Sequence, residues 1–384
     1  MKDIHVLFRV PEGLEFIAVK DIKDSIVDST IVRDPTFSWD NKTGHVHLFC
    51  SVKDIKDFKS HIQSIKLLSV YSVMLIASEA IIPTFVFKET DSTCQFISKV
   101  TTEGDWESLI DEDSSKTFRA TFKKGSIKHQ VPSQEIAGYI GAAFGDRYSH
   151  WKVKMTEFDY EIMSVWFHSS DDTLLNRLSA KESSIILLVG LNIPIKDQKH
   201  RNRVFFGPTS LNPSIAYCLT MLADPQPGQI IFDICCGTGT IPIEGASKYP
   251  NTFWLGGEIK SKTLTEKARG NLSHTNLDNA ELLLSDSRKL CFRDGIVDTI
   301  ISDWPWGLRE NSFQQIQGLY PKFIKQMYRI LKNEGKAYIV TQGQKLMNTV
   351  LRYDWCKKQW LVNDIIPIGI GGYEVYLYIL SKRT

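Results

Sequence analysis

Residues 302–307, with the sequence Ser-Asp-Trp-Pro-Trp-Gly, bring together the groups that can turn an aromatic amine into a nucleophile. The lone pair of such an amine is delocalised into its ring, so the amine is unreactive until hydrogen-bond acceptors favour a pyramidal nitrogen. The Asp303 carboxylate and the backbone carbonyl of Trp304 can provide two such acceptors. Pro305 would make the turn rigid, and Trp306 offers a flat face on which an aromatic ring can stack. We expect these four residues to be catalytic; the alternative is a tight turn with a buried tryptophan.

A glycine-rich turn at residues 233–240 reads Asp-Ile-Cys-Cys-Gly-Thr-Gly-Thr and follows an apolar run. Glycines at such a position let the backbone turn sharply and approach a ligand, and open α/β sheets bind cofactors at this strand-to-helix turn. A dinucleotide fingerprint would have a third glycine where this chain has Pro242, and the sequence has no G-x-x-x-x-G-K-[ST] phosphate loop. A plain structural turn would contain the same glycines. The residues expected to bind a cofactor here are Asp233, Cys235, Gly237 and Gly239.

Acidic residues follow the next two apolar runs. Glu258 ends the second run, where a carboxylate can accept hydrogen bonds from two ribose hydroxyls, and Asp286 with Ser287 follows the third. One acid at a strand end is more often a helix cap or a surface charge. Three acids at the ends of successive parallel strands meet at one edge of a sheet, however, and beside the glycine turn they predict a nucleoside-shaped pocket. We therefore expect Glu258, Asp286 and Ser287 to bind the cofactor.

These residues depend for their positions on strands and helices that alternate from Asn212 onward. Asn212 is a good helix cap, and Pro213 suits the first helical turn. The alternation, followed by an antiparallel pair at the sheet edge, predicts a doubly wound α/β domain of seven strands with helices on both faces. The predicted strands are residues 229–234, 253–259, 281–285, 298–304, 336–342, 360–370 and 373–382, and the predicted helices between them are residues 243–249, 264–274 and 320–331.

The motif at residues 302–307 resembles the (N/D)PP(Y/F/W) motif of methyltransferases that act on exocyclic amino groups. With GPTSLNPSIAYCLTMLADP, CCGTGTIPIEGA and the late GGYEVYLYIL, it is similar to the THUMP-domain tRNA guanine-N2-methyltransferases of eukaryotes and archaea. The resemblance implies a Rossmann-like fold with the last strand antiparallel, S-adenosylmethionine as the cofactor, and methyl transfer to N2 of a guanosine in the acceptor-stem region of tRNA. It places Thr209 or Ser210 at the methionine carboxylate of the cofactor. Trp304 is a departure, because many relatives carry Pro, Leu or Ile there.

The first half of the chain predicts two α+β pieces. The order strand, helix, two strands, helix, strand in the first eighty residues is typical of a ferredoxin-like fold. The GLE at residues 13–15 and the later FRATFKKGS are similar to the ferredoxin-like and THUMP modules of the family. We expect an N-terminal ferredoxin-like domain at residues 1–85, a THUMP RNA-binding domain at 86–195, a linker at 196–211 and a methyltransferase domain at 212–384.

Charge is unevenly distributed along the chain. Lys and Arg number 46 against 44 Asp and Glu, so the net charge of +2 excludes a uniformly basic protein. Residues 87–115 carry a net charge of −6, whereas residues 116–154 carry +6. With Tyr148 and Trp151, which we expect to be exposed, the basic segment indicates an RNA-binding surface, the alternative being ordinary solvated strand and helix faces. The residues expected to contact RNA are Arg119, Lys123, Lys124, Arg147 and Lys152.

The cysteines favour a reducing compartment. None of the seven forms a C-x-x-C pair, and the adjacent Cys235 and Cys236 suit neither a disulfide framework nor a zinc site, so we expect no metal. Residues 1–13 lack the apolar core of a signal peptide, and the apolar neighbourhood at residues 69–87 contains Glu79 and Pro83, so we expect no membrane partner. We expect a cytoplasmic location, with the nucleus as a second compartment.

Several functions fit the same residues. The resemblance implies a tRNA substrate and a small zinc-containing activator subunit that would cover an apolar surface. N2-methylation of a small nuclear or ribosomal RNA, methylation of adenine N6, and a catalytically idle RNA-binding scaffold remain open. Asp303, Glu258 and both motif glycines, all present, count against the idle scaffold.

Overall fold

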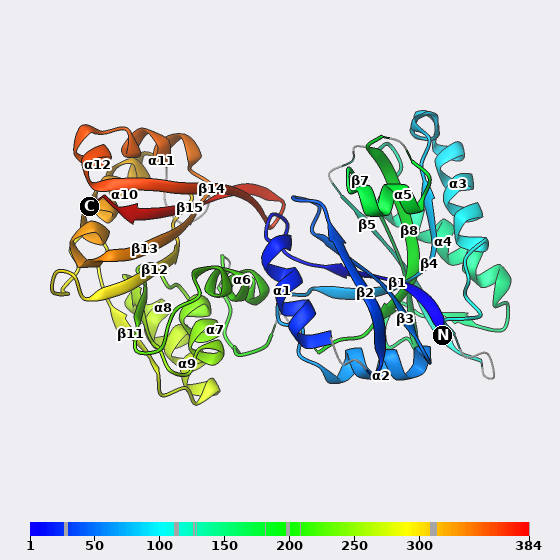
Figure 1. Ribbon diagram of the computed structural model, residues 1–384, viewed down its shortest axis with the longest axis horizontal. Helices are drawn as coiled ribbons and strands as arrows, with labels where there is room; N and C mark the ends of the chain where they lie inside the picture. The colour runs from blue at the N-terminus through cyan, green and yellow to red at the C-terminus, as the bar shows by residue number, and fades with distance from the viewer. Residues whose placement is uncertain are drawn as a thin grey trace. The chain divides into compact units, whose positions relative to one another are not determined.

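The computed structural model describes residues 1–26, 30–110, 115–125, 127, 129–180, 182–196, 200–207, 209–307 and 313–383. The chain divides into two compact units, Met1–Lys196 and Asp197–Thr384, which Figure 1 shows with their elements labelled. Each unit has its own sheet, of eight strands in the first and seven in the second among the described residues.

The first unit is an α+β structure. Its elements are β1 (Lys2–Arg9), α1 (Glu15–Ile26), β2 (Val32–Trp39), β3 (His45–Val52), α2 (Ile55–Ser64), β4 (Ser72–Ile81), η1 (Thr84–Lys88), α3 (Thr90–Thr102), β5 (Thr117–Lys124), α4 (Ser133–Arg147), β6 (Lys152–Val153), β7 (Tyr160–Ser169), α5 (Asp172–Arg177) and β8 (Ser184–Ile193). The predicted βαββαβ order is therefore confirmed over residues 2–81.

One sheet runs through this whole unit, in the order β2-β3-β1-β4-β8-β7-β5-β6. The link is β8, which pairs antiparallel with both β4 and β7. The boundary that we predicted between residues 85 and 86 therefore does not separate two sheets. The division into a ferredoxin-like domain at residues 1–85 and a THUMP RNA-binding domain at residues 86–195 stays a prediction.

Three histidines lie buried within this sheet. His5 on β1 and His45 and His47 on β3 are each less than 5% exposed. The rings of His5 and His47 have centroids 5.2 Å apart, and both pack near the Phe49 ring. The aromatic character of imidazole lets these side chains occupy core positions when they are neutral.

The second unit is a doubly wound α/β structure. Its elements are α6 (Pro213–Ala223), β9 (Ile230–Asp233), α7 (Thr240–Lys248), β10 (Phe253–Glu258), α8 (Ser261–Thr263), the π-helical turn η2 (Leu264–Ala268), α9 (Arg269–Thr275), β11 (Ala280–Leu284), β12 (Val297–Asp303), α10 (Phe313–Ile330), β13 (Leu331–Thr341), α11 (Gln344–Leu351), α12 (Asp354–Gln359), β14 (Trp360–Ile370) and β15 (Tyr373–Lys382). All seven predicted strands are present.

The order of this sheet is β11-β10-β9-β12-β13-β15-β14. Neighbours from β11 to β13 are parallel, and β15 runs antiparallel to β13 and β14, which confirms the predicted topology. In Figure 1, α6, α7 and α9 lie on one side of the sheet and α10 to α12 on the other. Because both faces are covered, successive residues such as Ile300 and Ile301 of β12 are both fully buried.

The described part of the predicted linker, residues 200–207 and 209–211, belongs to the second unit and is not a free tether. Arg201 forms an ion pair of 2.9 Å with the buried Glu244 of α7, and the Asn202 amide donates to the same carboxylate. Arg203, only 6% exposed, donates to the carbonyl of Leu211. We expected a linker because the segment is basic; its basic residues instead neutralise a carboxylate on α7.

Candidate active site

The glycine turn lies between β9 and α7, as predicted. Gly237 and Gly239 have φ values of +56° and +84°, a backbone conformation that residues other than glycine rarely adopt. The turn is closed by hydrogen bonds from the Gly239 N–H to the Cys236 carbonyl (2.8 Å) and from the Cys236 N–H to the Gly257 carbonyl (2.9 Å). A Cβ atom added at Gly237 would meet no atom within 4 Å. The backbone here therefore borders open space that a ligand could fill.

Asp233 ends β9 beside this turn and is 2% exposed. Its Oδ1 accepts hydrogen bonds from the Ser302 hydroxyl (2.6 Å) and the Cys235 N–H (3.1 Å). The pKa of the Asp233 carboxyl is nevertheless raised to about 7, chiefly by burial and further by the charges of Asp303 and Glu258. The strand ends thus bring Asp233, Glu258 and Asp303 close enough for their charges to repel one another, whereas we had expected Asp286 as the third acid of this group.

Glu258 and Asp286 have different surroundings. Glu258 ends β10, is 9% exposed, and accepts a hydrogen bond of 2.7 Å from the Lys260 N–H. Asp286, which follows β11, forms an ion pair with Arg288 at 2.7 Å, and hydrogen bonds from this guanidinium hold the pKa of the carboxyl low. Asp286 therefore already has a cationic partner within the chain, whereas Glu258 has a backbone donor.

Cys235 and Ser287 pack beneath the turn. The Ser287 hydroxyl is buried and donates to the carbonyl of Ile234. The Sγ atom of Cys235 lies 3.9 Å from the Ser287 Oγ, and burial raises the pKa of this thiol. Both residues support the turn from within, and direct cofactor contacts for them stay a prediction.

The segment that contains Thr209 and Ser210 lies against the glycine turn. The Ser210 Oγ accepts from the Gly207 N–H at 2.8 Å and lies 3.0 Å from the Thr238 Oγ1. Thr209 is exposed. The structure therefore brings Ser210 to the glycine turn, and a contact of Thr209 or Ser210 with the methionine carboxylate stays a prediction.

Asn271 of α9 holds residues 204 and 205 in place through hydrogen bonds, a role that we did not predict from the sequence. It is fully buried, and its Oδ1 accepts from the N–H groups of Val204 and Phe205 at 2.9 and 2.8 Å. Its Nδ2 donates to the carbonyls of Phe205 and Thr238, both at 3.0 Å. A lone asparagine within a predicted amphipathic helix was the only available signal for this role.

The predicted catalytic turn follows β12. The Trp306 Nε1 donates to the Asp303 Oδ1 at 2.9 Å, so the ring and the carboxylate hold each other in place. The Trp306 ring also lies edge-on to the half-exposed Tyr373 at the start of β15, with centroids 6.2 Å apart. Asp303 and Trp306 therefore form one polar and aromatic surface beside the glycine turn.

The Trp304 side chain is buried, whereas its expected role in catalysis concerned only its backbone carbonyl. Its side chain is 1% exposed and packs in the core against Tyr320 and Phe323 of α10, so it does not line a base pocket. The Trp304 N–H donates to the Val340 carbonyl at 2.9 Å. Pro305 presents its carbonyl to the Tyr320 hydroxyl at 2.9 Å. Trp304 thus anchors the turn, and substrate contact through its backbone carbonyl stays a prediction.

The residues predicted to bind RNA lie in the first unit and divide into two groups. Lys123 and Lys124 on β5 and Lys152 on β6 are exposed and belong to neighbouring strands. Arg119 forms an ion pair with Glu161 at 2.9 Å, and Arg147 forms one with Glu107 at 3.0 Å.

The aromatic residues of the basic segment correct our expectation. Tyr148 and Trp151 are 2% and 6% exposed and stack around Phe144. They are core residues because α4 ends on Phe144 and Tyr148, one helical turn apart, and so presents both to the sheet. An RNA surface in this region would therefore depend on charge and not on these aromatic rings.

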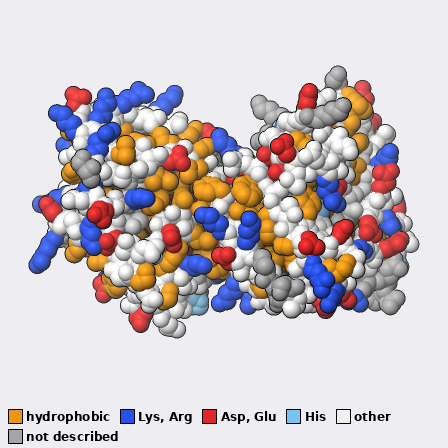
Figure 2. All heavy atoms as spheres, in the orientation of Figure 1, with side chains coloured by type: hydrophobic (Ala, Val, Ile, Leu, Met, Phe, Trp, Pro, Cys, Tyr) orange, Lys and Arg blue, Asp and Glu red, His pale blue; other side chains and the backbone are white. Residues whose placement is uncertain are grey.

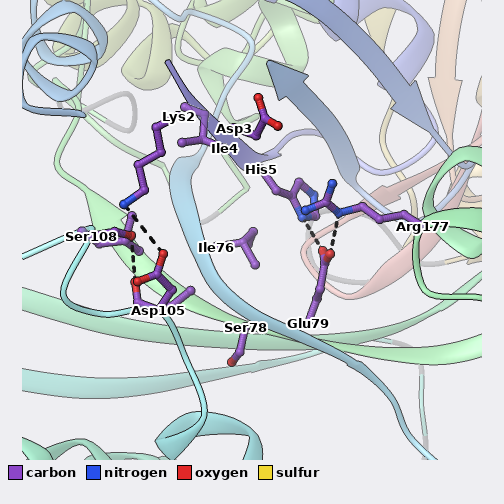
Figure 3. A pocket seen from close by; sticks show the side chains of 12 residues that line it. Lys2, Asp3, Ile4, His5, Ile76, Ser78, Glu79, Asp105, Ser108 and Arg177 are labelled. Atoms are coloured by element: carbon purple, nitrogen blue, oxygen red, sulfur yellow. Dashed lines mark hydrogen bonds and ion pairs between the residues drawn. The ribbon is translucent and has the colours of Figure 1, made fainter. Parts of the chain in front are cut away.

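A polar cavity of about 180 Å³ in the first unit contains none of the predicted site residues. Figure 3 shows that its charged side chains face one another. His5 and Arg177 both contact Glu79, and Lys2 contacts Asp105 at 3.7 Å.

Within the described residues, no group of histidine, cysteine or acidic side chains could hold a metal, and no helix is long and apolar enough to cross a membrane. The second unit therefore carries the arrangement that points to catalysis.

Known proteins share these features. Residues 200–365 match the UPF0020 family, described as an RMKL-like methyltransferase domain. The tRNA (guanine(6)-N(2))-methyltransferase THUMP3 of Bos taurus is 31% identical over 280 residues, which are 70% of this chain and 51% of that protein. The tRNA (guanine(6)-N2)-methyltransferase of Methanocaldococcus jannaschii is 25% identical over 314 residues, which are 72% of this chain and 78% of that protein. This chain thus spans about half the length of the bovine relative.

A solved structure shows the same fold. TrmN from Thermus thermophilus has a TM-score of 0.70 at 18% sequence identity, and the match covers 99% of this chain and 100% of TrmN. The glycine turn and the Asp-Trp-Pro-Trp turn both lie within residues 200–365, which match the methyltransferase domain. Residues 200–365 therefore match an RMKL-like methyltransferase domain, and the chain is similar in sequence to proteins named tRNA (guanine-N2)-methyltransferases.

Proposed function

We propose that this protein transfers a methyl group from S-adenosylmethionine to the N2 amine of a guanosine in the acceptor-stem region of tRNA. The observation that carries the proposal is the contact between Trp306 and Asp303 at the end of β12, in the same unit as the glycine turn and the buried Asp233. The names of the bovine and archaeal relatives, both tRNA (guanine(6)-N2)-methyltransferases, support the choice of substrate.

The residues present suit this cofactor. The open space at Gly237 leaves room at the strand-to-helix turn, where a side chain would intrude. Glu258 at the end of β10 would accept the ribose hydroxyls, and Ser210 would lie at the methionine end. Asp233 is a buried carboxylate that would interact with the positively charged amino group. Bound S-adenosylmethionine supplies an electrophilic methyl group on a sulfonium.

The chain's own residues would orient and activate the target amine. The guanine ring would stack on Trp306, which offsets part of the few kcal/mol needed to draw a base out of its helix. Because the Trp306 indole is tied to Asp303, a stacked base would present its amino edge to that carboxylate. Holding the reacting nitrogen and carbon at about 3 to 3.5 Å contributes roughly 7 to 11 kcal/mol. Asp303 would then accept an N–H bond that strengthens as the nitrogen becomes acidic.

The first unit would hold the RNA by charge. Lys123, Lys124 and Lys152 lie exposed on β5 and β6, where phosphate contacts would fix the orientation of the RNA without reading its sequence. Affinity should then fall with salt, with a log–log slope of about −0.7 for each phosphate contact on single strands.

A partner would cover an apolar surface of the second unit. Figure 2 shows hydrophobic side chains gathered on the visible face of this unit. Exposed apolar residues of the β14–β15 hairpin include Leu361, Val362 and Ile365. A small zinc-containing activator subunit is the partner we propose for such a surface, in the cytoplasm or the nucleus.

The test is a methylation assay with defined RNAs. Purified protein, alone and with the activator, is incubated with labelled S-adenosylmethionine and tRNA, and the nucleosides are identified and mapped by mass spectrometry. We expect N2-methylguanosine in tRNA. Product only in small nuclear or ribosomal RNA, or N6-methyladenosine, would refute the proposed substrate, and failure to bind S-adenosylmethionine would favour an idle scaffold.

Asp303→Ala tests the residue that we place at the amine. Loss of this acceptor should lower kcat by about 1000-fold, as removal of a single transition-state hydrogen-bond partner does in other enzymes. RNA binding, measured by filter retention, should stay unchanged because Asp303 lies outside the basic segment. Near-normal turnover of the variant would contradict the proposed role.

A further inference from the structure

Tyr320 of α10 connects the core of the second unit to the catalytic turn. Its side chain is fully buried, yet its hydroxyl reaches two polar groups. The Oη atom lies 2.9 Å from the Pro305 carbonyl oxygen and 2.6 Å from the Thr341 Oγ1 at the end of β13. The Thr341 Oγ1 also lies 3.0 Å from the Gly343 nitrogen.

The direction of these hydrogen bonds follows from the groups involved. A carbonyl can only accept, so the Tyr320 proton points at Pro305. The Thr341 hydroxyl must therefore donate to the Tyr320 oxygen, and it accepts from the Gly343 N–H, which can only donate. The result is a directed chain from Gly343 through Thr341 and Tyr320 to Pro305.

The same helix holds the preceding residue of the turn. The Trp304 ring packs edge-on against Tyr320, with centroids 4.9 Å apart, and against Phe323 at 5.2 Å. Residue 304 is thus fixed through its ring and residue 305 through its carbonyl. Because the peptide after Pro305 is planar, fixing this carbonyl also fixes the start of Trp306.

We propose that Tyr320 is a positioning residue for methyl transfer, whose hydroxyl sets the orientation of Trp306 and hence its contact with Asp303. This inference rests on the proposed function, because it assigns Trp306 to the target base. Tyr320 contacts neither substrate nor cofactor in this role. Removal of the Tyr320 hydroxyl should therefore lower turnover and leave cofactor binding unchanged.

The test compares two Tyr→Phe variants of the same unit. Tyr320→Phe keeps the ring that packs on Trp304 and removes only the hydroxyl. Tyr378→Phe on β15 is the matched control: Tyr378 is also fully buried, and its hydroxyl bonds to the Asn348 Oδ1 at 2.8 Å and the Gln344 carbonyl at 3.4 Å instead of to the catalytic turn. Tyr320→Phe loses the hydrogen bonds to Pro305 and Thr341, and Tyr378→Phe loses those to Asn348 and the Gln344 carbonyl, so their melting temperatures should fall by similar amounts.

Their kinetics should differ. Tyr320→Phe should lower kcat by about 10- to 100-fold, the size of effect that a small misplacement of reacting groups produces, with KM for S-adenosylmethionine within about twofold of wild type. Tyr378→Phe should keep the wild-type kcat. Equal losses of kcat in both variants, or a normal kcat for Tyr320→Phe, would overturn the proposal.

A second pair keeps the test informative if Tyr320→Phe folds poorly. Thr341→Val removes the donor to Tyr320 and should lower kcat, whereas Thr341→Ser retains the hydroxyl and should restore it. Failure of serine to restore turnover would overturn the directed chain. An inactive wild-type protein would instead count against the proposed function, so the two failures are distinguishable.

Discussion

The two units bury ionisable groups of opposite kinds. In the first unit, burial lowers the pKa values of His5, His45 and His47, to about 3 for His45. In the second unit, burial and neighbouring carboxylates raise the pKa of Asp233 to about 7. The folded first unit thus favours the neutral form of its buried histidines, and the folded second unit disfavours the ionised form of Asp233.

The partners of these groups also differ. His5 bonds to Glu79 and His47, and Glu79 in turn contacts Arg177, whereas the buried Nδ1 of His45 has no hydrogen-bond partner among the described residues. Among the described residues, the Asp233 carboxylate accepts hydrogen bonds from one hydroxyl and one backbone N–H, and it lies near two further carboxylates. A buried carboxyl group whose pKa is raised in this way is typical of a functional site. A buried carboxylate that lies close to other carboxylates is therefore a stronger sign of a binding site than a buried neutral histidine.

Acid should unfold the first unit before the second. Below pH 6.5 each buried histidine is protonated in the unfolded chain but stays neutral in the folded unit, so the free energy of unfolding falls as the pH falls. Between pH 7.0 and 5.5 the loss should be about 1 kcal/mol for each of His45 and His47, whose pKa values are held well below 6.5 in the folded unit, and His5 acts in the same direction. Asp233 acts with the opposite sign: its folded pKa is raised, so the second unit gains stability as the pH falls from 7 towards 4.

Hydrogen exchange followed by mass spectrometry would separate the two units, after correction for the pH dependence of chemical exchange. Peptides from residues 30–110 should open more readily at pH 5.5, while those from residues 209–307 should not. His45→Phe should reduce this pH dependence, and His168→Phe, at an exposed position, is its control. Earlier opening of the second unit would contradict the comparison.

Asp233→Asn should separate stability from binding. The amide keeps the shape of the carboxylate and can still accept from Ser302, but it removes a buried charge. We expect a higher melting temperature at pH 8 and an affinity for S-adenosylmethionine that is about 10-fold weaker, a loss of about 1.4 kcal/mol. Calorimetric titration would measure the affinity. The exposed Asp278→Asn should change neither quantity, and an unchanged affinity in Asp233→Asn would remove this residue from the proposed cofactor site.

Of these variants, Lys123→Ala should have the smallest effect, and it should change only the affinity for RNA. Loss of one phosphate contact would reduce the log–log salt slope of RNA affinity by about 0.7, with kcat unchanged at saturating RNA. Lys99→Ala is the matched control, because Lys99 is exposed but lies on α3, outside the basic segment. An equal change of slope in both variants would show a diffuse charge effect instead of a defined surface.

The fold of the second unit could be predicted from the sequence because its strands are apolar runs, four of which end at or shortly before an acidic residue. The positions of Asp233, Glu258 and Asp303 followed from the same rule. Trp304 and Tyr148 were harder, because an aromatic residue in a turn or at a helix end has the same sequence signal whether it is exposed or buried. Asn271 and Tyr320 act through hydrogen bonds to distant backbone groups, which no local pattern reveals.

The pairing of β8 with β4 was equally invisible, because it joins segments on either side of the predicted domain boundary. This feature has a consequence for synthesis on the ribosome. At roughly 5 to 20 residues per second, the edge of β4 waits about 5 to 20 seconds for β8 to emerge. An unpaired strand edge is a template for association with other chains. Nascent chains that stop before residue 184 should therefore need a chaperone, whereas completion of β8 removes that need.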